Sequence, residues 1–169
     1  MAEEVQPKPI ATLITENVTE TLSRVRIEQG GGVALIVERL NEENHEFNRP
    51  RHLLAIVDPG DPVKADNQAE NEDEFTRDYV IHVWVMPSQT NGVPIDETMD
   101  QVIANITRAL CADDGQSSPK IYTRGGLAID TTALDPETIG PFPKSLAYLV
   151  NVSVQVRYTT RERDPYRKG

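Results

Sequence analysis

The sequence predicts an α+β protein, with a mixed, mainly antiparallel sheet of about four to five strands and two helices packed on one face. Two segments place apolar residues at the three- and four-residue spacing of an amphipathic helix. A segment near the C-terminus alternates apolar and polar residues, as strands do. Most expected strands follow one another along the chain, which favours antiparallel or mixed pairing with the helices on one side.

The first helix is expected at residues 10–25. Its apolar face carries Ile10, Leu13, Ile14, Val18, Leu22 and Val25. Three threonines lower its intrinsic propensity, so tertiary packing must stabilise it. The glycines at 30–32 end this segment, because glycine readily adopts the left-handed conformation that follows a helix. Residues 33–40 and 52–58 are then expected to be strands, separated by a polar stretch.

The central strand of the sheet is expected at residues 75–86. Both of its faces carry bulky apolar side chains, which indicates a strand inside the sheet. The second helix begins near Pro94, with Asp96 and Glu97 close to the positive end of the helix dipole. Its apolar face carries Met99, Val102, Ile103, Ile106 and Leu110.

The last strand is the clearest element of the sequence. Alternate apolar side chains from Leu146 to Tyr158 predict one buried face. The intervening residues predict a face in contact with water; they are Asn151, Ser153, Gln155, Arg157 and Thr159. A short strand is expected after Gly125-Gly126. Residues 131–143, which contain three prolines, are expected to be a loop.

A length of 169 residues predicts a single domain, 1–169, with one core. Three segments are expected to stand apart from that core: a loose N-terminal arm (1–9), a flexible acidic loop (59–74) and a basic C-terminal tail (159–169). The acidic loop has only three apolar side chains, too few to order it by burial. Loops of this length are uncommon in compact domains and are often functional.

The formal net charge of −10 is unevenly distributed. Residues 58–78 contain eight acidic residues against Lys64 and Arg77, whereas the chain from Arg157 onward has a net charge of +3. This asymmetry suggests contact with further copies of the chain or with a charged partner, although two solvated segments would have the same composition. The acidic balance argues against specific binding of duplex DNA, because basic contacts to phosphate dominate that affinity.

The single cysteine, Cys111, excludes an internal disulfide and fits a reducing compartment. The N-terminus, Met1–Glu4, is acidic and has no apolar core, so no signal peptide is expected. The longest apolar runs are too short to span a bilayer. We therefore expect the protein to begin in a cytoplasm, with no membrane among its partners.

No group of residues in the sequence predicts catalysis. Glycine-rich phosphate loops and the Gly-x-Ser-x-Gly sequence of hydrolases are both missing. His45, His52 and His82 lack the spacing of zinc ligands, and His82, within a strand, is expected to be a hydrogen-bonded sheet histidine. The acidic loop lacks the glycine and terminal glutamate of an EF-hand. We expect no enzyme, no metal ligands and no cofactor.

Several segments together resemble the tail terminator, or tail completion, proteins of long-tailed bacteriophages. One is the first helix running into a glycine turn and strand (residues 22–31), and another is the pair of strands bridged by a long polar loop. The others are Arg124-Gly-Gly-Leu-Ala-Ile-Asp130 and the ending Val154-Gln-Val-Arg-Tyr-Thr-Thr-Arg-Glu-Arg-Asp-Pro-Tyr166. The resemblance covers nearly the whole chain. The acidic loop is longer than the corresponding loop expected for the tail terminator family.

The resemblance implies a structural virion protein that forms a hexameric ring at the head-proximal end of the tail tube. Such a ring ends tube polymerisation and forms the interface to the head connector. The implied partners are other copies of the chain, the tail tube protein and the head–tail connector protein. Genome DNA would pass through the lumen without specific binding. The implied location is the virion, with the host cytoplasm during assembly.

We expect subunit or partner contacts in the two oppositely charged segments, at Gln155, Arg157, Arg161, Arg163, Asp164, Tyr166, Glu70, Glu72, Asp73 and Glu74. In this hypothesis, the basic tail of one subunit pairs with the acidic loop of its neighbour, and these segments become ordered on assembly. Three alternatives are another head–tail connector or minor tail protein of the neck, a metal-dependent enzyme that uses the acidic loop, and an unrelated soluble binding domain.

Overall fold

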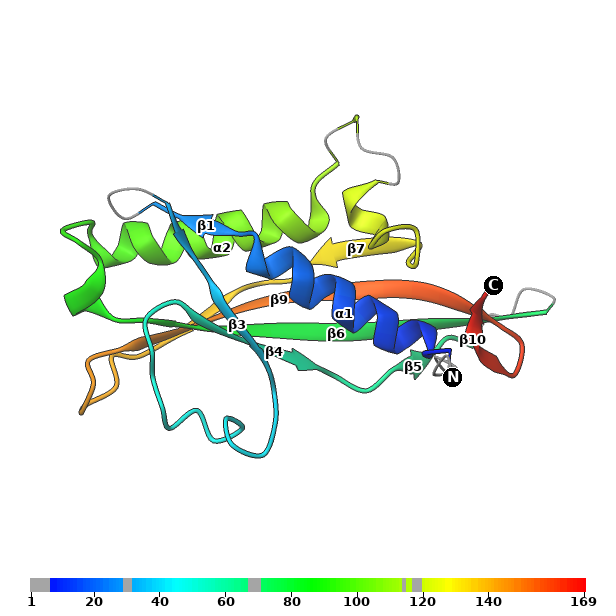
Figure 1. Ribbon diagram of the computed structural model, residues 1–169, viewed down its shortest axis with the longest axis horizontal. Coiled ribbons are helices and arrows are strands. Elements are labelled where there is room, and N and C mark those ends of the chain that lie inside the picture. Colours follow the sequence, from blue (N-terminus) through cyan, green and yellow to red (C-terminus); the bar gives the residue numbers. More distant parts are fainter. Residues whose placement is uncertain (1–6, 29–31, 67–70, 114, 117–119) are drawn as a thin grey trace, which may run out of the picture.

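The computed structural model describes residues 7–28, 32–66, 71–113, 115–116 and 120–169. Their elements, shown in Figure 1, are α1 (Ile10–Ser23), β1 (Arg26–Ile27), β2 (Val33–Ala34), β3 (Ile36–Arg39), β4 (Leu54–Pro59), β5 (Val63–Lys64), β6 (Glu72–Val85), η1 (Pro87–Gln89), α2 (Ile95–Cys111), η2 (Ile121–Thr123), β7 (Asp130–Ala133), β8 (Glu137–Ile139), β9 (Tyr148–Arg161) and β10 (Asp164–Lys168).

The main sheet has the strand order β10-β9-β6-β4-β3, with β5 beside β6 and with β7 and β8 beside β9. The β3–β4 pair is parallel and the remaining pairs of this sheet are antiparallel. A separate antiparallel pair joins β1 and β2. The α+β class and the mixed sheet are therefore confirmed, but the described residues form eight strands in this sheet, more than the predicted four to five.

Helix α1 packs on the sheet through four buried apolar side chains, Ile10, Ile14, Val18 and Leu22, and Thr15 is buried beside them. Its threonines are accommodated by bonding back along the helix: the Thr15 hydroxyl donates to Ala11 O at 3.0 Å, and the Thr19 hydroxyl donates to Thr15 O at 2.8 Å. The helix ends at Ser23, two residues before the predicted end, because the chain turns there toward β1.

Helix α2 follows the predicted pattern closely. Pro94 precedes its first turn, Asp96 and Glu97 lie in that turn, and Arg108 lies in the last one. These charges match the two ends of the helix dipole. The buried side chains of α2 are Thr98, Val102, Ile106 and Leu110.

Strands β6 and β9, each 14 residues long, pair along their whole length, from Glu72 opposite Arg161 to Val85 opposite Tyr148. Strands in globular proteins average about 5–6 residues, so this unusually long pair is the main structural element of the sheet. We call it the ribbon; Figure 1 shows its two strands running side by side along the long axis of the molecule.

The two faces of the ribbon belong to different hydrophobic clusters. One face packs against both helices in the larger core, to which the ribbon contributes Tyr79, Ile81, Val83, Val85, Val150, Val152, Val154, Val156 and Tyr158. This confirms that both helices cover the same face. The opposite face has a smaller cluster of Leu54, Ile56, Trp84, Ala147 and Leu149, with Phe47 and Phe142 packed against it.

Two loop predictions are corrected by the additional strands. The segment 131–143 contains most of β7 and all of β8, which pair with β9. Leu134 continues this pairing by donating its amide to Ser153 O at 2.9 Å. The main-chain N–H and C=O groups along this edge of β9 need hydrogen-bond partners, and β7 and β8 provide them. Because this pairing uses the main chain, neither short strand needs an apolar pattern that the sequence would reveal.

The acidic loop is also shorter than the predicted 59–74. Pro59 ends β4, residues 63–64 form β5, and β6 already begins at Glu72. The basic tail 159–169 consists of the end of β9, a turn and β10. Of the predicted N-terminal arm, only residues 7–9 are described, and they lead directly into α1; the rest of that prediction lies outside the described residues.

Candidate functional site

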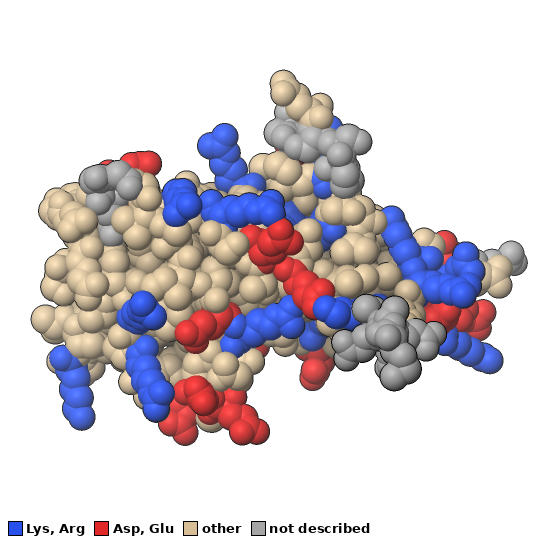
Figure 2. Space-filling view, viewed as in Figure 1, with Lys and Arg blue, Asp and Glu red and all other residues tan. Residues whose placement is uncertain are grey.

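The described residues of the predicted interface gather at one end of the ribbon, where β6 begins and β9 ends. Glu72 lies opposite Arg161, while Asp73 and Glu74 lie opposite two threonines of β9. We call residues 72–78 and 155–168 the charged end. Figure 2 shows acidic and basic side chains next to each other at this end, on the right of the view.

On the face away from the helices, the charged end is held by cross-strand polar pairs. The Arg157 guanidinium lies 3.7 Å from a carboxylate oxygen of Glu74. The Gln155 amide donates to the Asp78 carboxylate at 2.9 Å. Exposed ion pairs contribute only about 0–1 kcal/mol each. These contacts therefore specify the register of the strands more than they stabilise the fold.

Asp73 lies on the helix side of the ribbon and is buried, with 6% of its surface exposed. Lys64 of β5 forms an ion pair with Asp73 Oδ1 at 2.7 Å, and the backbone amide of Arg163 donates to Oδ2 at 3.2 Å. The Lys64 ammonium, together with this amide, holds the pKa of Asp73 below its ordinary value. One carboxylate thus joins β5, β6 and the turn after β9.

The turn and β10 present the remaining predicted residues to solvent. The Arg163 side chain is 90% exposed and lies 3.6 Å from Glu162. The Asp164 carboxylate pairs with Arg167 at 3.5 Å and accepts a hydrogen bond from the Tyr166 amide at 3.1 Å. The Tyr166 ring itself is half exposed. These side chains are accessible to another protein.

The end of β10 is anchored to a distant turn. The Lys168 ammonium donates to Gly126 O at 2.5 Å, and Gly125 and Gly126 both have positive φ, which glycine adopts at no steric cost. The same turn precedes Ile129, whose amide donates to Arg157 O at 2.7 Å, so two segments of the sequence resemblance, Arg124–Asp130 and Val154–Tyr166, are in direct contact.

The structure changes the hypothesis about charge pairing. Acidic and basic segments that were expected to meet across a subunit boundary already meet within one chain, at Asp73 and Glu74. Residues 72–74 are part of paired strands in the single chain, and the hypothesis that the acidic loop becomes ordered on assembly stays a prediction. Glu70, the remaining predicted interface residue, lies outside the described residues.

Sequence reasoning missed Lys64, which was counted only as a charge opposing the acidic run. The antiparallel pairing of Lys64 with Phe75 brings its ammonium to Asp73. No spacing in the sequence reports this contact, because it depends on how the segment after β4 returns to β6. The only signal available in the sequence was a lysine among acidic residues, and this signal could not indicate which carboxylate the lysine would pair with.

A second polar cluster lies on the helix-free face, nearer the middle of the ribbon. One ring nitrogen of His82 lies 2.7 Å from the Asn151 amide oxygen, and the other lies 3.3 Å from the Asp58 carboxylate. The Phe47 ring lies 4.5 Å from the imidazole, centroid to centroid. The prediction of a hydrogen-bonded sheet histidine is confirmed.

Arg124, in the segment used for the resemblance, is buried with 1% of its surface exposed. Its guanidinium donates to Leu110 O at 2.6 Å and also to Ile121 O, so it caps the last turn of α2. Burial lowers the pKa of Arg124 to about 10 and raises the pKa of the neighbouring Cys111 thiol to about 11. Arg124 therefore has a structural role, and this cysteine is not an activated nucleophile.

Within the described residues, no three His, Cys, Asp or Glu side chains are close enough together to hold a metal ion. In the same part of the chain, neither helix is long and apolar enough to cross a membrane. The chain was also compared with known proteins. No protein-family model matches it, and no curated protein matches it significantly.

Proposed function

We propose that this chain is a structural protein of the virion of a tailed bacteriophage, which caps the tail tube, ends its polymerisation and forms the interface to the head connector. The proposal rests on the sequence resemblance together with one structural observation. That observation is the charged end, an accessible surface carried on two fully paired 14-residue strands.

The charged end is suited to binding proteins because its side chains are already positioned. Arg157 and Gln155 are held by partners across the ribbon, and Asp73 fixes the turn before β10. A preorganised surface loses little conformational entropy when a partner binds. Arg161, Arg163 and Tyr166 remain exposed and available for contacts. The proposed partners are further copies in a hexameric ring, the tail tube protein and the connector.

The overall charge supports a passage for DNA in preference to a DNA-binding site. A chain with a net charge of −10 repels phosphate over much of its surface. A ring of such chains would let the genome pass through its lumen without holding it.

Deleting the gene from its phage and imaging the lysate by electron microscopy tests this proposal. We expect full heads beside unattached tails of abnormal, variable length, because nothing ends tube growth or joins the tube to the head. Complementation with the wild-type gene on a plasmid is the control.

Two other results would change the assignment. Full heads without any tails would favour the alternative neck or minor tail role, in which the protein is needed before the tube is complete. Normal infectious particles would refute a structural role in the virion.

A further inference from the structure

An open groove of about 470 Å³ lies where the C-terminal ends of the two helices meet β1 and η2. Its apolar lining includes Val25, Ala109 and Ile121, and three arginines also line it: Arg24, Arg26 and Arg108. The groove shares no lining residue with the charged end. A basic, concave surface on a chain with a net charge of −10 is a candidate site for an acidic partner.

Two of the three arginines are available to bind an anion. Arg24 forms an ion pair with Glu20, one helical turn earlier. Arg26 and Arg108 have exposed side chains, and no carboxylate among the residues that the structure describes forms an ion pair with either. The Asn105 amide donates to Arg26 O at 2.8 Å and so ties β1 to α2. Guanidinium groups bind carboxylates with two parallel hydrogen bonds.

The chain itself has a matching acidic surface. The loop between β3 and β4 has a tip, residues 41–46, that contains three glutamates and no lysine or arginine. Its backbone is held by two asparagines: Asn41 Oδ1 accepts from the Glu43 amide, and Asn44 Oδ1 accepts from the Asn41 amide, both at 2.8 Å. The carboxylates of the tip are exposed. This tip is therefore preorganised to enter a concave partner.

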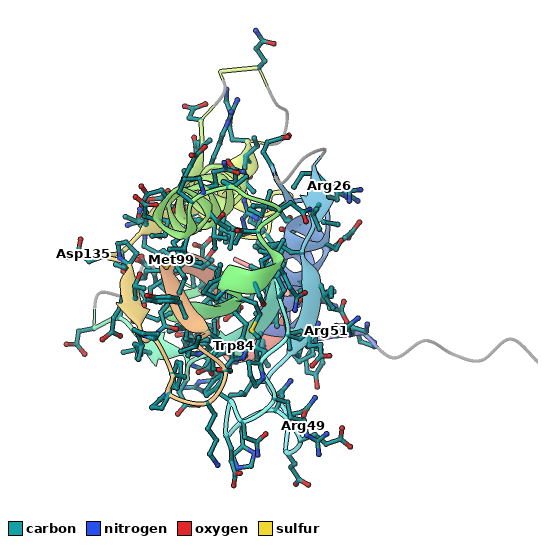
Figure 3. All side chains as sticks on the ribbon, turned by 90° about the vertical axis from the view of Figure 1, so that its left-hand side faces the viewer. Arg26, Arg49, Arg51, Trp84, Met99 and Asp135 are labelled. Atoms are coloured by element: carbon teal, nitrogen blue, oxygen red, sulfur yellow. The ribbon has the colours of Figure 1, made fainter. Side chains whose placement is uncertain are left out.

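The tip and the groove lie on opposite sides of the molecule. Figure 3 labels Arg26 near the top of the molecule and Arg49, which follows the tip, at the bottom. The tip of one chain is therefore far from its own groove. We infer that the groove binds the carboxylates of Glu42 and Glu43 from the tip of a second copy of this chain.

This inference rests on the proposed ring and specifies one of its contacts. Every copy offers one groove and one tip, so the contact joins two different surfaces. Such heterologous contacts form a closed ring when the rotation between neighbours divides a full turn, and a filament when it does not. In a simple twofold dimer, by contrast, the same surface of both copies can meet, so no pairing of a groove with a separate tip is needed.

Sedimentation velocity of the full chain tests the inference with two charge-neutralised variants, R26Q/R108Q for the groove and E42Q/E43Q for the tip. We expect the wild type to self-associate at about 0.1 M salt and much less at about 1 M, where the screening length falls from about 10 Å to about 3 Å. Each variant alone should show a self-association that is at least about tenfold weaker than that of the wild type. Circular dichroism checks that both remain folded.

Mixing the two variants makes the test specific. The mixture retains one intact contact, the tip of the groove variant in the groove of the tip variant, so we expect dimers and nothing larger. R49Q/R51Q is the matched control, because it removes two exposed arginines from the same loop outside the tip and should not weaken association.

Three outcomes would overturn the inference. The first is a wild type that is monomeric at every concentration, and the second is association unchanged in both variants. The third is binding of a short DNA duplex to the groove through Arg26 and Arg108, with no change in the self-association of the chain. None of these bears on the gene-deletion phenotype, so the proposed function is judged separately.

Discussion

The two faces of the ribbon are built from alternating residues of the same strands but differ in chemistry. The helix side is apolar and fully buried at its centre, as at Ile81 and Val83. The opposite side is apolar only at one end, at Trp84 and Leu149, and along the rest of its length it carries polar groups. Among these, His82 and Gln155 make specific hydrogen bonds. Burial drives folding without direction, whereas hydrogen bonds contribute less free energy but specify which groups meet.

This chemical difference indicates that the two faces of the ribbon contribute differently to stability and to binding. The helix side has the larger buried core and so supplies most of the stability, and its residues can be exchanged only for others of similar volume. The helix-free side and the charged end supply register and an accessible surface. Substitutions on the two faces should therefore differ in the size and the kind of their effect.

The largest effect is expected on the helix side. Ile81→Ala should lower the free energy of unfolding by about 2–5 kcal/mol, because it removes buried methyl groups and leaves a cavity in the larger core. Chemical denaturation measures this loss. Val80→Ala, at the half-buried adjacent position on the opposite face, is the control and should cost clearly less. Equal losses would contradict the division between the faces.

An intermediate effect is expected at the histidine cluster. Asn151→Leu should cost about 1–3 kcal/mol, because it leaves a ring nitrogen of His82 without its partner in a largely buried position. The double variant His82→Phe/Asn151→Leu removes both groups and should cost less than the sum of the single changes. A double-mutant cycle by urea denaturation measures this coupling. Additive losses would mean that the hydrogen bond does not contribute.

A smaller, pH-dependent effect is expected at Asp73. Its pKa in the folded protein lies below the ordinary value of 3.8. Ionised Asp73 therefore stabilises the fold above that pH, and the contribution is lost as the pH falls through the folded-state pKa. Asp73→Asn should lower Tm at neutral pH, and its difference from the wild type should shrink under acid conditions.

Thermal melts across this pH range test the Asp73 prediction. Asp66→Asn is the control, since Asp66 is exposed in the same acidic segment and should show little difference from the wild type at any pH. A Tm difference for Asp73→Asn that stays constant down to strongly acidic pH would exclude the ion pair with Lys64 as its cause.

The smallest effect on stability is expected for Arg157→Glu combined with Arg161→Glu. Both side chains are solvent-exposed, and the pair of Arg157 with Glu74 is a surface ion pair. The monomer should remain folded by circular dichroism, while the reversed charge at the charged end should block assembly into particles. Arg39→Glu, on the edge strand β3, is the control. Normal assembly of the double variant would refute a role for these arginines in contacts between proteins.

The sequence alone determined the elements that carry their own periodicity. Apolar spacing located α1 and α2 to within a few residues, and strict alternation located β9 and its buried face. The prediction of a water-facing side was wrong at Asn151, which is buried, and Leu146, predicted on the buried side, is 61% exposed and precedes the strand. It also identified the charged segments that meet at one end of the ribbon. These features were predictable because each depends on side chains close together in the chain, which set one face of a helix or strand against water.

Only the tertiary structure decided the short strands and the partners of the buried charges. Strands β5, β7, β8 and β10 have no apolar alternation, and they form because the main-chain groups of β6 and β9 require hydrogen-bond partners. The contacts of Lys64 with Asp73 and of Arg124 with the end of α2 join segments brought together by the chain path. Local sequence cannot specify such contacts, because their energy depends on burial and on distances that exist only after the sheet has formed.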